Sequence, residues 1–239
     1  LLPILFTLVR REYIRLYVFS FLLAIAITEV TSYLVWFQIL PEFRFATVVN
    51  PTPFMSHISY NPILALAIYI VLHEVCFNKK LSNFLFSFYS FFAISMIINM
   101  FITGGRAGQV IFFVMLAILI FQIFHKERLK SLIVISIVIP GIFFAAYQLS
   151  WLFEKRVDFA ITEIVNYEET NLSSLGLRIN FARNSWQVIK KNPLIGVGTG
   201  DFPMEYLKIN QINSPSLPNA SNPHNMYVLV LMQLGLLGL

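Results

Sequence analysis

Long apolar runs separated by short polar stretches dominate this sequence. The hydrocarbon core of a bilayer is about 30 Å thick, so a helix needs roughly 20 apolar residues to cross it. Runs of about that length predict five membrane-spanning helices: Leu16–Leu40, Asn61–Phe77, Phe84–Ile102, Ala107–Phe124 and Ser131–Ser150. The pattern therefore predicts an all-α fold, a polytopic transmembrane helical bundle.

The two ends of the chain carry shorter apolar segments. Leu1–Val9 reads as the tail of an earlier span, because it is too short for the apolar core of a signal peptide with its charged flank and cleavage site. Another run enters at His224, reaches Leu239 and predicts the start of a further span. We therefore expect the chain to be a fragment of a larger protein.

The composition agrees with a membrane protein. Hydrophobic residues make up 57% of the chain and charged residues only 12%, which is far more apolar than an average soluble domain. The one cysteine, Cys76, excludes an intramolecular disulfide. We expect the lipid bilayer to be a partner and expect no nucleic acid partner.

Basic residues in short connections predict which helix ends face the cytoplasm, because such residues are retained on that side. Three basic connections alternate with the others: Arg10–Arg15, Asn78–Lys80 and His125–Lys130. The remaining connections then lie outside: Pro41–Tyr60, Thr103–Arg106 and Trp151–Pro223. The sequence thus predicts membrane helices over 1–150, a long outer loop over 151–223 and the start of another span over 224–239.

The long outer loop contains one clear helical pattern. Apolar residues recur there at helical spacing until Asn192–Pro193, which predicts an amphipathic helix over about 174–191. The apolar positions are Leu175, Ile179, Ala182, Trp186 and Ile189. On a helical wheel, Arg178 falls at the edge of this stripe and Arg183 on its far flank.

A glycine-rich stretch, PLIGVGTGDF, follows that predicted helix. Its Gly196, Gly198 and Gly200 permit tight backbone conformations. The stretch resembles a nucleotide phosphate loop only superficially, since no predicted strand precedes it and no Lys-Ser/Thr pair follows it.

Polar residues at outer helix starts are candidates for chemistry. Asn222 is the predicted N-cap of the last span and Pro223 its first helical residue, which places His224 and Asn225 in the first turn. Arg106 directly precedes another predicted helix, where a guanidinium and free backbone N–H groups together suit phosphate oxygens.

Arginines on the outer side indicate an anionic ligand, because Arg44, Arg106 and Arg178 have few acidic neighbours in the sequence. A structural interpretation competes with this one. Arg44 and Arg106 can extend to the membrane interface, and Arg178 and Arg183 can belong to a solvated helix face.

Three further ionisable residues allow two interpretations. His224 is either a reactive group or a polar residue at the interface, and His57 has similar surroundings and competes with it. Glu29 lies deep in the first span, where an acid is costly, and is either functional or paired with a residue of a helix missing from this sequence.

The order of these segments resembles the O-antigen ligase and polymerase family of bacterial inner-membrane glycosyltransferases. The similarity extends from about Asn61 to the end and rests on TGGR, LRINFARNSWQVIKKNPLIGVGTGDF and NPHNMYVLVLMQLGLLGL. Family members often have Ser-Arg where this chain has Gly105-Arg106.

The resemblance implies a donor glycan on undecaprenyl pyrophosphate, an acceptor on lipid A-core or a glycan, and reaction at the periplasmic face of the inner (plasma) membrane. It implies no cofactor and no metal. Arg106 and Arg178 would bind the pyrophosphate, and His224 would activate the acceptor hydroxyl, with inversion of the anomeric carbon. Further substrate contacts are expected from Arg44, Arg183, Asn225, Gly198 and Gly200.

Several functions stay open at the level of sequence. An O-antigen polymerase and a protein oligosaccharyltransferase share the same motifs. A membrane transporter is the alternative from another class, and it would place ionisable residues through several helices, whereas only Glu29 is clearly central here.

Overall fold

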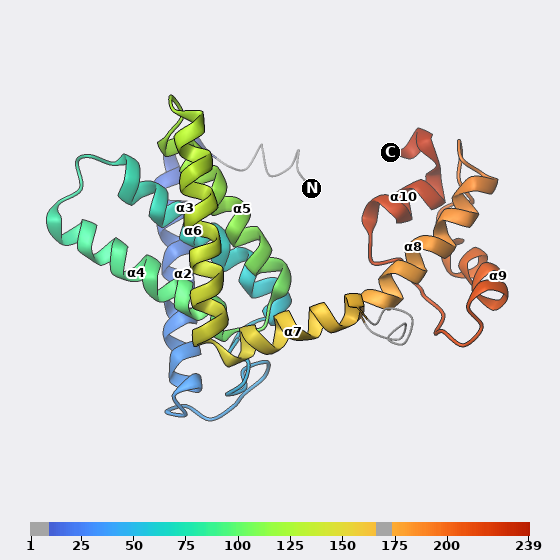
Figure 1. Ribbon diagram of the computed structural model, residues 1–239, viewed down its shortest axis with the longest axis horizontal. Coiled ribbons are helices and arrows are strands. Elements are labelled where there is room, and N and C mark those ends of the chain that lie inside the picture. The colour runs from blue at the N-terminus through green and yellow to red at the C-terminus, as the bar shows by residue number, and fades with distance from the viewer. Residues whose placement is uncertain (1–9, 166–173) are drawn as a thin grey trace. The chain divides into compact units, whose positions relative to one another are not determined.

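The computed structural model describes residues 10–165 and 174–239. Within those ranges the regular elements are all helices, so the predicted all-α class is confirmed (Figure 1). The expected earlier span at Leu1–Val9 lies outside the described residues. The elements are η1 (Arg11–Tyr13), α2 (Ile14–Trp36), α3 (His57–Phe77), α4 (Asn83–Ile102), α5 (Arg106–Ile123), α6 (Arg128–Leu149), α7 (Trp151–Val165), α8 (Ser174–Lys191), α9 (Phe202–Asn213), α10 (Met226–Leu234) and η2 (Leu236–Gly238).

Five of these helices, α2 to α6, are long and apolar enough to cross a membrane, which confirms the five predicted spans. Their ends differ from the prediction by a few residues. The first span ends at Trp36 rather than Leu40, because Gln38 adopts a left-handed conformation (φ 58°) and Pro41 follows. The chain is therefore a multi-pass membrane protein.

The chain divides into two compact units, Leu1–Val157 and Asp158–Leu239, and the boundary falls within α7. In the first unit, α3 packs against α4 and α5, and α5 packs against α6. The core between them includes Tyr60, Leu64, Ile68, Met96 and Phe112. Large apolar side chains elsewhere on these helices are exposed, as expected for helices surrounded by lipid.

Three connections meet at one end of the first unit. The backbone N–H of Gly104, in the α4–α5 turn, donates to Asn50 Oδ1 of the α2–α3 loop at 3.0 Å. The Ser150 hydroxyl, at the end of α6, donates to the carbonyl of Phe101 at 2.7 Å. The α5–α6 connection lies at the other end, as Figure 1 shows.

The second unit is built from α8, α9 and α10. Its core includes Phe181, Val188, Phe202, Tyr206 and Met232. The residue range of α8 coincides with the helix predicted from the sequence, whereas α7 and α9 were not predicted.

The buried face of α8 covers only part of the predicted apolar stripe. Ile179 and Trp186 of the stripe are 41% and 52% exposed, whereas Ile189 is buried together with Phe181 and Val188. That face also carries Asn184 and Ser185, whose polar side chains are buried with it.

Candidate active site

Buried polar side chains hydrogen-bond to the α4–α5 turn that carries Arg106 and hold it in place. Thr103 Oγ1 donates to Asn61 Oδ1 of α3 at 2.7 Å, and Gln109 Nε2 of α5 donates to the carbonyl of Thr103 at 3.3 Å. Asn61 Nδ2 also contacts the carbonyl of Gly105 at 3.4 Å. Buried polar groups that are satisfied in this way specify one backbone arrangement, so the position of Arg106 as the first residue of α5 is well defined.

Gly105 fits the turn because it has no side chain. A Cβ at this position would lie 2.6 Å from the carbonyl oxygen of His57 and 2.7 Å from Asn61 Nδ2. A serine before Arg106 would require the start of α3 to move. The glycine therefore matches the close approach of α3 in this chain.

A second set of polar contacts continues into the bundle beneath the turn. The Tyr60 hydroxyl donates to Asn99 Oδ1 at 3.0 Å, and Asn99 Nδ2 donates to Ser32 Oγ at 2.9 Å. Glu29 accepts a hydrogen bond from Ser95 Oγ at 2.6 Å. Glu29 thus has a hydrogen-bond partner on α4, and a functional role for Glu29 stays a prediction.

Asn50 brings His57 to the Arg106 turn. Its side-chain oxygen accepts from Gly104, and its side-chain nitrogen lies 2.5 Å from His57 Nδ1. Arg44 belongs to the same α2–α3 loop but lies exposed in a tight turn, with φ 50°. The loop therefore reaches the Arg106 turn through Asn50, and a role for Arg44 stays a prediction.

Arg156 is a candidate that the sequence analysis missed. Its guanidinium covers the turn, with Nη2 3.0 Å from the point where a Cβ of Gly104 would lie. Arg156 belongs to α7, which begins directly after the fifth span, and an amphipathic helix at that position would have been the signal. The first unit thus holds two arginines, Arg106 and Arg156, at one turn.

In the second unit, His224 lies against α8. Its ring stacks on Phe181, with 5.9 Å between ring centroids and 25° between ring planes. Arg178 is exposed and precedes Phe181 by three residues on α8, and residues at that spacing are neighbours on a helix surface. The structure therefore brings His224 and the Arg178 turn of α8 together.

Arg183 does not share this neighbourhood. It is exposed and lies two residues after Phe181, which places it about 200° around the helix, nearly opposite the His224 contact. The sequence had placed Arg183 on the far flank of the helix, and a substrate contact from it stays a prediction.

The predicted cap of the last helix is wrong. Asn225, not Asn222, is the N-cap, and its Oδ1 accepts from the backbone N–H groups of Tyr227 at 3.0 Å and Val228 at 3.3 Å. Asn222 Oδ1 instead accepts from the backbone N–H of His224 at 2.8 Å, in a separate turn before the helix. His224 consequently precedes α10 rather than lying in its first turn.

The backbone of His224 is strained. Its φ of 53° is a left-handed conformation that costs a residue with a side chain of order 1–3 kcal/mol, and such residues gather at functional sites. The side chain is exposed and its ring is held by Phe181. This combination favours a functional role for His224 over a role in capping, which Asn225 fulfils.

The glycine-rich stretch pairs with the end of α10 through backbone atoms. Val197 and Gly198 donate to the carbonyls of Met232 and Gln233, each at 2.9 Å. In the other direction, Leu236 and Leu237 donate to the carbonyls of Pro193 and Leu194, at 2.9 Å and 3.2 Å. These bonds join the two sequence blocks that carry the family resemblance.

Two glycines make this pairing possible. Gly196 and Gly235 have φ angles of 68° and 66°, and a Cβ on either one would overlap the backbone of the opposite segment. Gly198 donates its backbone N–H to the pairing, whereas a Cβ on Gly200 would meet nothing within 4 Å. Substrate contacts from Gly198 and Gly200 stay predictions.

A buried amide network connects α8 to α9 and to the segment that returns to His224. Asn184 Nδ2 donates to Asn210 Oδ1 at 3.2 Å, and Asn210 Nδ2 donates to the carbonyl of Leu217 at 3.1 Å. Tyr206 completes the network, and burial raises the pKa of its hydroxyl while the hydrogen bond from Asn184 opposes that shift. No cluster of three His, Cys, Asp or Glu side chains suited to a metal ion occurs among residues 10–165 and 174–239.

Comparison with known proteins identifies the family. Residues 91–239 match the family model described as O-Antigen ligase, which is more than half of the chain. The chain therefore belongs to the O-antigen ligase family, a class of membrane enzymes of the glycosyl-transfer type. Membership implies a role in O-antigen processing, with a lipid-carried glycan donor and an acceptor in the membrane. No curated protein and no solved structure matches the chain.

Proposed function

We propose that this protein transfers a glycan from undecaprenyl pyrophosphate to lipid A-core at the periplasmic face of the bacterial inner membrane. The observation that carries the proposal is the contact between His224 and Phe181, one turn from Arg178. This contact brings His224 next to the turn of α8 that carries the exposed Arg178, in a region that matches the O-antigen ligase family.

Arg106, Arg156 and Arg178 bind the pyrophosphate in this proposal. When the bond between the anomeric carbon and the phosphate oxygen breaks, both bonding electrons stay with the lipid pyrophosphate. Guanidinium groups hydrogen-bond such oxygens strongly, and donors fixed in advance stabilise the charge that grows in the transition state. The buried contacts of Thr103 and Gln109 below the Arg106 turn supply that fixation.

His224 acts on the acceptor hydroxyl. A neutral imidazole takes the hydroxyl proton as the oxygen attacks the anomeric carbon, a contribution of roughly 10²–10⁴ in rate. The oxygen attacks opposite the departing pyrophosphate, so the product has the inverted anomeric configuration. The stack on Phe181 orients the imidazole for this step.

The remaining candidates contact other parts of the substrates in this proposal. Arg44 and Arg183 are exposed cations suited to charged sugars or headgroups. Gly198 and Gly200 leave backbone close to the surface for sugar hydroxyls. Asn225 caps α10 through its side-chain oxygen, which leaves its amide nitrogen to contact the acceptor.

Complementation of a strain that lacks the gene tests the function. The full-length protein restores glycan-bearing lipopolysaccharide, whereas the His224→Ala protein leaves bare core and polymerised glycan on its lipid carrier. The matched control is His125→Ala, because His125 is an exposed histidine of the α5–α6 connection. It should complement fully.

Other outcomes of this experiment point to other functions. Core that carries single repeat units in the deletion strain identifies a polymerase. Normal lipopolysaccharide with missing glycoprotein glycans identifies transfer to protein. Full transfer by His224→Ala at normal protein level contradicts the mechanism, and a deletion that changes no glycan favours the transporter.

A further inference from the structure

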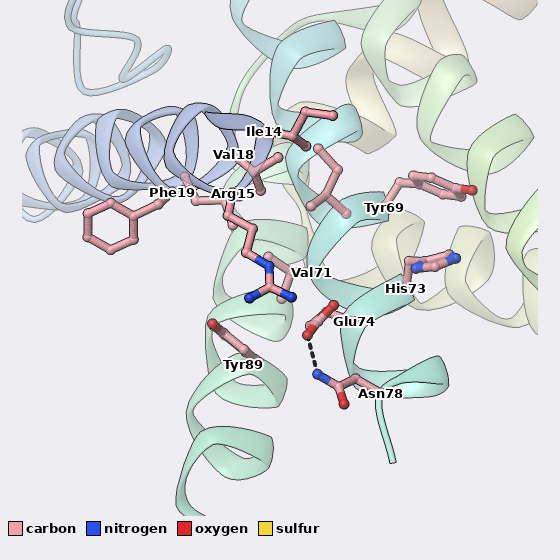
Figure 2. Close-up of a pocket in the computed structure, with 12 residues that line it drawn as sticks. Ile14, Arg15, Val18, Phe19, Tyr69, Val71, His73, Glu74, Asn78 and Tyr89 are labelled. Atoms are coloured by element: carbon pink, nitrogen blue, oxygen red, sulfur yellow. Dashed lines mark hydrogen bonds between the residues drawn. The ribbon is translucent and has the colours of Figure 1, made fainter. Parts of the chain in front are cut away.

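A cavity of about 800 Å³ lies in the first unit, at the end opposite the Arg106 turn. Its walls are the beginning of α2, the end of α3 and the first half of α4 (Figure 2). The lining residues all precede residue 91, where the match to the family model begins. The cavity is therefore separate from the residues assigned to glycan transfer.

One wall of the cavity is apolar and the other is polar. Val18 and Leu22 of α2 and Val71 of α3 form the apolar part. Figure 2 shows Arg15 extending from α2 toward Glu74 of α3 and Tyr89 of α4. The cavity thus combines a surface suited to a hydrocarbon chain with a guanidinium and a carboxylate.

A hydrogen bond from Asn78 holds the carboxylate of Glu74 in place. Asn78 Nδ2 donates to Glu74 Oε1 at 2.5 Å, and Asn78 follows the last residue of α3 directly. This bond uses one oxygen of the carboxylate and leaves the other able to accept from a ligand. His73, which also lines the cavity, stacks on Phe77, with 4.6 Å between ring centroids.

We propose that this cavity binds a phospholipid whose headgroup carries both a phosphate and a primary ammonium, as phosphatidylethanolamine does. Arg15 donates to the phosphate, Glu74 accepts from the ammonium, and an acyl chain lies along Val18 and Leu22. A volume of about 800 Å³ is within the range of ligand sites, roughly 300–1,000 Å³.

The carboxylate selects the headgroup. A lone arginine would accept any phospholipid, because every phospholipid carries a phosphate. Glu74 repels the uncompensated charge of an acidic lipid and attracts an ammonium that can donate hydrogen bonds. A trimethylated ammonium has no N–H to donate, so phosphatidylcholine loses this contact although its net charge is the same.

Native mass spectrometry of the purified full-length protein with defined lipids tests the proposal. The protein should retain phosphatidylethanolamine in preference to phosphatidylcholine and phosphatidylglycerol. Glu74→Gln should lower the retention of phosphatidylethanolamine about tenfold, to the level of phosphatidylcholine, as expected for one lost charge-assisted hydrogen bond. Glu127→Gln, at an exposed glutamate of the α5–α6 connection, should change nothing.

Further variants separate the cavity from general attraction to basic residues. Arg15→Ala should weaken retention of all three lipids, whereas Arg11→Ala, at an exposed arginine outside the lining, should not. Val18→Trp should fill the apolar wall and reduce retention with an unchanged melting temperature.

Three results would overturn the proposal: stronger retention of phosphatidylglycerol, no effect of Glu74→Gln, or no effect of Val18→Trp. Competition by inorganic phosphate alone, at equal strength for all three lipids, would likewise contradict it and identify a simple anion site.

Discussion

At the scale of single residues, His224 is defined by its neighbours more than by its place in the sequence. Its ring lies on Phe181, its backbone N–H is bound by Asn222, and its φ is left-handed. The sequence located this histidine next to a helix start but did not show which aromatic ring supports it. That contact depends on the buried face of α8, which carries the polar residues Asn184 and Ser185 beside Phe181.

Phe181 should act as a positioning residue for His224. Phe181→Leu keeps an apolar side chain in the core but removes the flat ring on which the imidazole rests. We expect kcat for glycan transfer in reconstituted vesicles to fall about tenfold with little change in KM, since orientation acts mainly in the transition state. Phe181→Tyr, which keeps the ring, should restore the rate. Equal loss in both variants at unchanged melting temperature would show that the ring is not what matters.

Tyr206 should make the second unit sensitive to alkaline pH. Burial raises the pKa of its hydroxyl above the usual 10.0, so the folded protein holds the proton more tightly than the unfolded chain. The stability from this group is complete below about pH 10 and is lost as pH rises through the folded pKa. Tyr206→Phe should lack this loss.

The fluorescence of Trp186 on α8 reports this transition, in a chain whose Trp36 and Trp151 are replaced by Phe. The melting temperature of the Tyr206 protein should fall more steeply above pH 10 than that of Tyr206→Phe. Parallel curves for the two proteins would show that unfolding does not change the pKa of Tyr206.

At the scale of elements, the long apolar helices and the range of the amphipathic α8 were predictable, whereas α7 and α9 were not. The spans α2 to α6 follow directly from their apolar runs. The range of α8 followed from its spacing and from Asn192–Pro193, but its buried side includes Asn184, and amide networks leave no apolar signal. Arg156 was missed because it lies on α7, a short helix with mixed apolar and charged residues that gives no long apolar run.

The pairing between the glycine-rich stretch and the end of α10 should depend on Gly235. Gly235→Ala forces a Cβ into the backbone of Leu194 and should lower the free energy of unfolding by about 3 kcal/mol or more. Gly200→Ala is the matched control, because Gly200 also has a positive φ (92°) but a Cβ there would meet no atom within 4 Å. It should cost about 1 kcal/mol. Equal melting temperatures for the two variants would show that backbone conformation, not close approach, sets the requirement.

At the scale of the whole molecule, the sequence predicts both the passes through the membrane and their direction. The helix count rests on run length, which the structure confirms, while the direction rests on charge in the connections and stays a prediction. Substituted cysteines test it in a chain that carries Cys76→Ala and otherwise lacks cysteine. The relevant sites are exposed residues in opposite connections: Thr47, Lys80 and Ser216.

A maleimide that cannot cross the inner membrane should label Thr47→Cys and Ser216→Cys in cells with a permeabilised outer membrane. Lys80→Cys should react only after lysis. Labelling of Lys80→Cys before lysis, with Thr47→Cys protected, would reverse the orientation and place the Arg106 turn in the cytoplasm.

The pairing of the glycine-rich stretch with the end of α10 also bears on how such proteins can diverge. The bonds at Val197, Gly198, Leu236 and Leu237 use main-chain atoms only, so most side chains of the paired segments do not determine them. Side chains of the two segments that point away from the pairing can therefore change while the backbone frame stays in place.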